Sequence, residues 1–158
     1  MSKKTFRIFA GLSITTYAIT NYAIIPVFPA GPSMYPLFNS WGDFCLAERA
    51  SWILFRQIRV GDVIVFVSPI NPTGWVCKVV VGLPGDIVSL ESTLEEPTSF
   101  IVGKGKIWVE GVFRENSMDS RDYGEFPMGL VRGKVWLKVW PQFGLLSSML
   151  HRIKHDRE

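Results

Sequence analysis

The chain has 158 residues, which suits one domain or one small domain with a membrane anchor. It is 47% hydrophobic and 20% charged with a net charge of +3, which excludes a disordered chain and gives no basis for nucleic-acid binding. Two cysteines, and two histidines near the carboxyl terminus, exclude a disulfide framework and argue against a Cys/His zinc site and histidine-dependent catalysis.

The first predicted element is an apolar segment near the amino terminus. Three basic residues precede it: Lys3, Lys4 and Arg7. Residues 8–28 contain no charge and would form a helix about 31 Å long, which matches a hydrocarbon core. We therefore expect residues 1–28 to be a retained membrane anchor, with the rest of the chain on the opposite side from the basic terminus. A cleavable signal, an organelle presequence and a buried core helix are the alternatives.

After Phe44 the apolar runs become short and are bounded by turn residues, which is typical of β-strands. The expected strands cover residues 62–67, 75–81, 86–90, 106–110 and 134–140. The polar stretch 91–99 is expected to be a loop, and a further helix fits only near the carboxyl end. The pattern predicts a mainly β, antiparallel domain over residues 29–145 and a basic tail over residues 146–158.

Lys78 is the first candidate for chemistry because it lies within an apolar predicted strand. Such a lysine lies either on a solvated strand face or in a desolvated pocket. Desolvation lowers the pKa of a lysine, and neutrality near pH 7.5 costs roughly 4 kcal/mol relative to an ordinary lysine. A neutral amine can take the proton of a serine hydroxyl and so replace histidine in nucleophilic catalysis.

The candidate nucleophile is Ser33, in the turn Ala30-Gly-Pro-Ser-Met-Tyr-Pro36. Gly31 permits close backbone approach, and the flanking prolines restrict the turn that presents the hydroxyl. Taken alone, this is also the sequence of an ordinary turn.

Four segments in a fixed order carry a family resemblance: Gly-Pro-Ser-Met-Tyr-Pro at 31–36, Arg-Val-Gly-Asp-Val-Ile-Val-Phe at 59–66, Lys-Val-Val-Val-Gly-Leu-Pro-Gly-Asp at 78–86 and Asn-Ser-Met-Asp-Ser-Arg-Asp-Tyr-Gly at 116–124. Together they resemble the type I signal peptidase family, the Ser/Lys membrane proteases, over about residues 28–141. Within that family they are most similar to the subunit 1 type of the mitochondrial inner membrane proteases. The resemblance implies a signal-peptidase-like antiparallel β domain with one amino-terminal transmembrane helix.

The same resemblance implies roles for five residues. Ser33 would be the acylating nucleophile and Lys78 its general base. Ser117 matches a serine that hydrogen-bonds the lysine amine, and Asp119 and Arg121 match a salt bridge that braces the site. No cofactor or metal is implied.

Three positions depart from the family pattern or leave a role open. Gly31 stands where some relatives have a serine whose hydroxyl donates to the oxyanion. The backbone N–H of the nucleophile would be one oxyanion donor, and the second donor is not identified. Val79 stands where a second basic residue is usual, and residues 111–114 read Gly-Val-Phe-Arg where Gly-Asp-Asn is common. Neither of the last two departures replaces a residue with an expected bond-making role.

The function implied is that of a membrane-anchored serine endopeptidase that removes sorting presequences from proteins delivered to the mitochondrial intermembrane space. The chain would reside in the inner membrane with its catalytic domain facing that space, and its partners would be precursor proteins, a second related protease subunit and the bilayer. Four aromatic residues are candidates either for contact with the bilayer surface or for the core: Phe38, Trp41, Trp52 and Phe55. A bacterial-type signal peptidase and a non-catalytic scaffold subunit are the alternatives.

Both cysteines are expected to be free and partly buried. Because neighbouring residues of a strand point to opposite faces, Cys77 is expected to lie away from the active site if Lys78 belongs to it.

Overall fold

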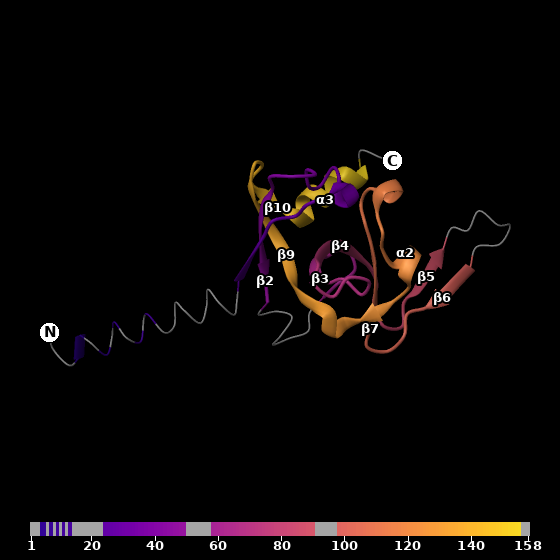
Figure 1. Ribbon diagram of the computed structural model, residues 1–158, viewed down its shortest axis with the longest axis horizontal. Helices are drawn as coiled ribbons and strands as arrows, with labels where there is room; N and C mark the ends of the chain where they lie inside the picture. The colour runs from indigo at the N-terminus through magenta and orange to yellow at the C-terminus, as the bar shows by residue number, and fades with distance from the viewer. Residues whose placement is uncertain are drawn as a thin grey trace.

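A strongly curled antiparallel β-sheet forms the body of the chain in the computed structural model, which describes residues 24–49, 58–90 and 98–155 and the helical residues 4, 5, 7, 9, 11 and 13 (Figure 1). Its strand order is β1-β2-β9-β3-β4-β7-β8, with β10 paired to β9. The strands of this sheet are β1 (Ile24–Val27), β2 (Phe44–Glu48), β3 (Val63–Val67), β4 (Trp75–Gly82), β7 (Lys106–Glu110), β8 (Phe126–Pro127), β9 (Val131–Trp140) and β10 (Gly144–Leu145).

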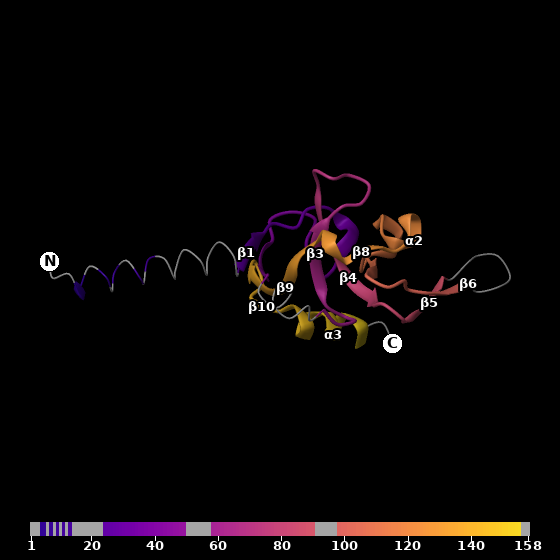
Figure 2. The ribbon, with the colours of Figure 1, turned by 90° about the horizontal axis from the view of Figure 1, so that it is seen from below.

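A separate hairpin of β5 (Ile87–Leu90) and β6 (Thr98–Ile101) projects from the side of the sheet opposite β1 (Figure 2). The helical elements are short except for the last: η2 (Pro32–Met34), η4 (Arg114–Asn116), α2 (Ser120–Tyr123), η5 (Met128–Leu130) and α3 (Leu146–His155). The fold class predicted from the sequence, a mainly antiparallel β domain, is confirmed.

The five predicted strands are all present, with small changes at their ends. The strand predicted at 134–140 begins three residues earlier, at Val131, and the loop predicted over 91–99 is wrong at its end because β6 begins at Thr98. Residues 91–97 lie outside the described part of the chain. The alternation of residues 134–140 correctly predicted a strand, but strand propensity alone did not predict the residue at which pairing with the neighbouring strands begins.

The predicted anchor overlaps the first strand of the sheet. β1 pairs antiparallel with β2, so residues 24–27 belong to the domain and not to a helix that continues to Phe28. Pro26 is tolerated because β1 is an edge strand, where a missing N–H breaks no ladder on the open side. Residues 14–23, the centre of the predicted anchor, lie outside the described residues. None of the helices formed by the described residues has the length and apolar composition needed to cross a bilayer.

Strand β3 separates two halves of the hydrophobic core. Val63 and Val65 face one cluster, which includes Met34 of η2, while Ile64 and Phe66 face the other, beneath β7 and β8. This explains the unbroken apolar run of the strand, because a central strand covered on both faces does not alternate with polar residues.

The start of the predicted basic tail is part of the domain. Helix α3 buries Leu146 and Leu150 in the first core cluster, and Met149 and Ile153 pack beside them. Their spacing of three and four residues places them on one face of the helix. The boundary predicted at residue 146 therefore cuts off a helix that covers the sheet.

Candidate active site

Ser33 lies in helix η2, within the loop that joins β1 to β2. Gly31 precedes this helix with φ of +96°, a conformation that favours glycine, and its N–H donates to the Ser40 carbonyl oxygen at 2.8 Å. The carbonyl oxygen of Ser33 accepts a hydrogen bond of 3.0 Å from the Phe113 N–H. The serine is half-buried and is held by its own backbone against the segment that follows β7.

Lys78 lies in β4 with only 3% of its surface exposed, so the desolvated alternative for this residue is the correct one. Its Nζ donates to Ser117 Oγ at 2.8 Å. Burial lowers the pKa of Lys78 below its ordinary value, and the nearby Asp119 carboxylate opposes that effect. The amine is therefore closer to neutrality at physiological pH than an exposed lysine.

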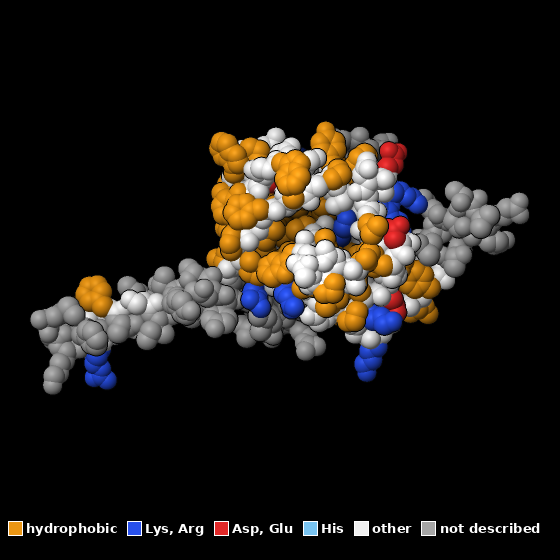
Figure 3. Space-filling view, viewed as in Figure 1, with side chains coloured by type: hydrophobic (Ala, Val, Ile, Leu, Met, Phe, Trp, Pro, Cys, Tyr) orange, Lys and Arg blue, Asp and Glu red, His pale blue; other side chains and the backbone are white. Residues whose placement is uncertain are grey.

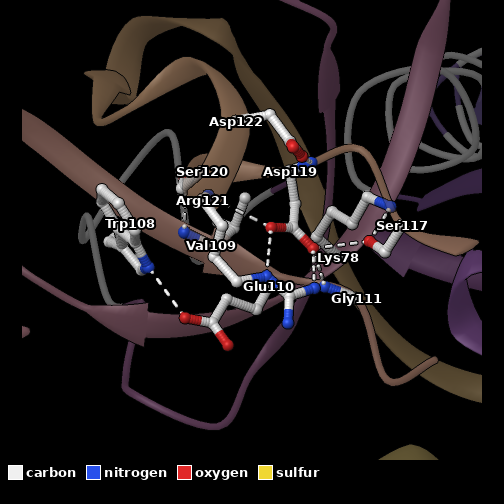
Figure 4. Close-up of polar contacts among 10 residues, drawn as sticks. All are labelled: Lys78, Trp108, Val109, Glu110, Gly111, Ser117, Asp119, Ser120, Arg121 and Asp122. Atoms are coloured by element: carbon white, nitrogen blue, oxygen red, sulfur yellow. Dashed lines mark hydrogen bonds and ion pairs between the residues drawn. The ribbon is translucent and has the colours of Figure 1, made fainter. Parts of the chain in front are cut away.

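The hydrogen bonds of Lys78 continue through Ser117 to an ion pair (Figure 4). Ser117 Oγ donates to Asp119 Oδ2 at 2.5 Å, and Arg121 forms a salt bridge of 2.6 Å with the same carboxylate oxygen. The Asp119 carboxylate is fully buried; burial alone would raise its pKa, but hydrogen bonds from Arg121, Ser117 and Gly111 hold the pKa below its usual value. Because the hydroxyl proton of Ser117 goes to Asp119, Ser117 can only accept from Lys78, and this orients the amine.

Gly111 brings the serine loop and this network together. A Cβ atom here would overlap Ser117 Oγ and would lie only 2.6 Å from the carbonyl oxygen of Ser33. Its N–H donates to Asp119 Oδ2 at 2.8 Å. The Ser33 loop, Ser117 and the buried carboxylate therefore pack around the glycine, next to Lys78. In the described residues, no hydrogen bond joins the Ser33 hydroxyl to Lys78; the amine is turned toward Ser117.

Two residues of this network, Gly111 and Ser120, have no role that the sequence predicts. In the sequence, Gly111 only begins a segment that departs from the family pattern. A glycine directly after a predicted strand does, however, indicate that another part of the backbone comes close to it. Ser120, fully buried, accepts from the Val109 N–H at 3.0 Å and fixes α2 to β7 (Figure 4). A second serine in an Asp-Ser-Arg segment carries no signal of this contact.

A groove of about 300 Å³ opens beside Ser33. One wall is formed by residues 26–31 and the other by residues 75–77, the first part of β4. β4 pairs with β7 only from Val79 onward, so residues 75–77 have a strand neighbour on one edge only within the described chain. The backbone groups on the other edge are free to pair with an extended peptide.

Cys77 lines this groove, which corrects its predicted position away from the site. It does point to the opposite strand face from Lys78, toward the core cluster that contains Met34, but the groove opens on that face. Burial raises the pKa of the Cys77 thiol to about 12, so the thiol stays protonated and is no competing nucleophile. Both cysteines are free, as predicted, and Cys45 is fully buried.

The arrangement combines four elements: a serine on a rigid turn, a desolvated lysine, a neutral hydroxyl that orients it, and a groove with a free strand edge. Among the described residues, no cluster of three or more His, Cys, Asp or Glu could hold a metal ion. Such a set can carry out acyl transfer on an extended peptide, with the lysine moving the protons.

Comparison with known proteins decides the family. The family model described as "Signal peptidase, peptidase S26" matches residues 2–96. The chain belongs to the signal peptidase family. Among its relatives in that family, mitochondrial inner membrane protease subunit 1 of Schizosaccharomyces pombe is 37% identical over 124 residues, 78% of each chain.

Two further relatives extend this assignment within the signal peptidase family. The human mitochondrial inner membrane protease subunit 1 is 37% identical over 166 aligned positions, covering 97% of this chain and 96% of the human protein. Subunit 2 of the same protease from Saccharomyces cerevisiae is 34% identical over 119 residues, covering 70% of this chain and 65% of that protein. This signal peptidase is thus a homologue of the mitochondrial inner membrane proteases and most similar to subunit 1 among these three.

Exposed aromatic side chains gather on one part of the surface of this signal peptidase. Hydrophobic side chains cover much of the face seen in Figure 3, over the region of β2, β9 and β10. The most exposed aromatic residues of the described domain are Phe28, Trp41, Trp140 and Phe143. Of the four aromatic residues predicted to contact a bilayer, Trp41 is 78% exposed, whereas Phe38 is fully buried and is a core residue. Trp52 and Phe55 lie outside the described residues.

Proposed function

We propose that this chain is the catalytic subunit of a membrane-bound protease that removes presequences by a Ser33/Lys78 mechanism. The observation that carries the proposal is the desolvated Lys78, hydrogen-bonded to Ser117 and packed beside the loop that presents Ser33. A lysine buried in this way is expensive to keep and is useful as a base, because its pKa is lowered toward the working pH.

The chemical steps follow from these positions. Ser33 Oγ attacks the scissile carbonyl carbon while Lys78 takes the hydroxyl proton. The C–N bond then breaks, Lys78 returns the proton to the leaving amine, and an ester joins the substrate acyl group to Ser33. Lys78 next takes a proton from water, whose hydroxide attacks the ester; the ester C–O bond breaks, and Lys78 returns the proton to Ser33 Oγ as the acid leaves. The backbone N–H of Ser33 donates to the oxyanion.

The groove accounts for substrate binding. An extended presequence fills the space between residues 26–31 and 75–77 and pairs with the free edge of β4, which places its scissile bond over Ser33. The half-buried side chains of Val76 and Cys77 favour small side chains beside the cut.

The setting of the protease rests on its relatives and on the sequence. The similarity to subunits 1 and 2 supports a second related subunit as partner, the inner mitochondrial membrane as location and intermembrane-space precursors as substrates. The apolar segment that precedes β1 would anchor the chain, with the catalytic domain in the intermembrane space. The exposed Trp41, Trp140 and Phe143 would then rest against the bilayer surface, where aromatic side chains are favoured.

Cleavage of a presequence-bearing precursor in membranes that contain the partner subunit tests the proposal. We expect Ser33→Ala and Lys78→Ala to abolish cleavage while both chains accumulate normally. Ser148→Ala and Lys104→Ala change the same residue types at exposed positions and should cleave at the wild-type rate. If either of the first two variants still cleaves, the Ser/Lys assignment is wrong and the scaffold alternative becomes the better one.

A further inference from the structure

A second buried lysine, Lys138, lies under the loop that carries Ser33. It belongs to β9, is 1% exposed, and forms an ion pair of 2.8 Å with Asp43, which is also 1% exposed. Its Nζ donates in addition to the carbonyl oxygen of Leu37 at 3.2 Å. Both partners of Lys138 come from the segment between β1 and β2, and the proposed chemistry uses neither.

The contact with Leu37 leads directly to the nucleophile. The next residue, Phe38, donates its N–H to the carbonyl oxygen of Met34 at 3.0 Å, and Met34 follows Ser33 in the chain. The ring of Phe38 also lies 5.9 Å below the Lys138 amine. The Lys138 amine therefore holds the backbone at Leu37, four residues after Ser33. The hydrogen bond from Phe38 to Met34 then links this part of the backbone to the residue next to Ser33.

The ion pair also fixes the far end of the loop. Asp43 accepts from the backbone N–H and the side-chain amide of Asn39, both at 2.8 Å. The Gly31 N–H closes the loop on the carbonyl oxygen of Ser40. The loop of residues 31–43 is therefore held at three points: Gly31 binds Ser40, and Lys138 binds both Leu37 and Asp43.

Stability alone does not explain a buried charge here. An apolar pair of similar volume is often as stable as a buried ion pair or more so, because two charges must be desolvated. An apolar side chain at Lys138 would, however, leave the Leu37 carbonyl oxygen without its donor. β9 also contains a comparison pair: Lys134 binds Asp62 at the same 2.8 Å, but both side chains are partly exposed and neither contacts the serine loop.

We propose that Lys138, together with Asp43, is a positioning residue that holds the loop so that the Ser33 hydroxyl and N–H face the scissile bond. This rests on the proposed function of Ser33. Displacement of a reacting group by about 1 Å can cost about 100-fold in rate. The pair therefore acts on catalysis through the backbone of the loop, without touching the substrate.

The test uses the complete detergent-solubilised protease, wild type and three variants: Lys138→Met, the double variant Asp43→Asn/Lys138→Met, and Lys134→Met as the matched control. Precursor cleavage is measured under single-turnover conditions, and thermal unfolding midpoints are measured on the same samples. The double variant removes both charges, so it should recover most of the stability that Lys138→Met alone loses. We expect its cleavage rate to stay about 100-fold below wild type, with Lys134→Met within about twofold of wild type. Recovery of rate together with stability would overturn the proposal, because a purely structural pair predicts that result.

Backbone amide exchange gives a readout that does not depend on cleavage. We expect residues 31–43 of the double variant to exchange at least about tenfold faster than in Lys134→Met, with β3 and β4 unchanged. Unchanged exchange in the loop, or faster exchange across the whole sheet, would overturn the positioning role. A wild-type protease that fails to cleave the precursor would instead overturn the proposed function, and the exchange result would still decide what Lys138 does to the loop.

Discussion

Lys78 and Lys138 are both buried lysines of one sheet, and what surrounds their amines differs. Lys138 contacts the Asp43 carboxylate directly at 2.8 Å, whereas Lys78 contacts the neutral hydroxyl of Ser117, which separates it from the carboxylate of Asp119. Burial lowers the pKa of Lys78, and the Asp119 carboxylate raises it. Because the Ser117 hydroxyl lies between the amine and that carboxylate, the carboxylate raises the pKa less than a direct contact would. Burial alone therefore does not make a base; the nearest partner decides whether a buried lysine is a base or a structural cation.

The largest expected effect comes from exchanging each lysine for arginine. Arginine stays charged at any physiological pH, so it can pair with a carboxylate but cannot take a proton. Lys78→Arg should lower the single-turnover cleavage rate by about 10⁴-fold, while Lys138→Arg should lose less than about tenfold. Substantial cleavage by Lys78→Arg would mean that another group is the base.

A smaller difference is expected in stability when each lysine becomes methionine. Lys138→Met leaves the buried Asp43 carboxylate unpaired and should cost about 3–5 kcal/mol of unfolding free energy. Lys78→Met removes an amine whose charge is already disfavoured, and Ser117 keeps its bond to Asp119, so the change should stay below about 1 kcal/mol. Urea unfolding of both variants at pH 7.5, followed by tryptophan fluorescence, compares them. Equal losses would show that Lys78 is also a structural ion-pair partner.

Gly111 tests whether close packing, and not only hydrogen bonding, keeps Ser117 between Lys78 and Asp119. Gly111→Ala places a methyl group against Ser117 and the Ser33 backbone, and we expect about 100-fold slower cleavage with about 1–3 kcal/mol lost in stability. Gly129→Ala is the matched control, because its Cβ would meet nothing within 4 Å. The same assays apply to both. If the two variants behave alike, the site tolerates movement around Ser117.

Sequence patterns were sufficient for the parts of the fold that depend on local periodicity. The apolar runs around residues 62–67 and 75–81 predict strands, and most of their side chains pack into the two core clusters on the two faces of the sheet. The edge strand β1 and its neighbour β2 were missed, since pairing partners far away in sequence decide whether residues 24–27 are strand or helix. The same limit applies to α2, which depends on the capping contacts of Asp119 and not on helix propensity.

For the site, the residue types were predictable and their environment was not. The apolar strand around Lys78 by itself favoured a solvated lysine, and only the segments that indicate a family favoured a desolvated one. Nothing in the sequence indicates the role of Lys138. In the predicted alternation it lies between Trp136 and Trp140 on one side of the strand, and the same side also carries Lys134. Only the register of β9 against β2, which places residue 138 opposite Cys45 beneath the loop, distinguishes the two lysines.

The pH dependence gives the finest test of the comparison, because burial lowers the pKa of Lys78. Between that lowered value and about 10.5 the unfolded chain holds a proton on Lys78 that the folded chain lacks, so the unfolded state binds more protons and stability rises with pH. Below the lowered pKa both states are protonated, and the full cost of burying the charge is present at every pH.

The measurement is the unfolding free energy of wild type and Lys78→Met from pH 7 to pH 10. Wild type should gain on the variant as pH rises, by at most about 1.4 kcal/mol per pH unit. The cleavage rate should level off where this stability gain begins, because above the lowered pKa the amine of folded Lys78 is already neutral and able to act as a base. If the rate levels off within this range while the stability difference stays flat up to pH 10, the pH dependence of the rate belongs to another group.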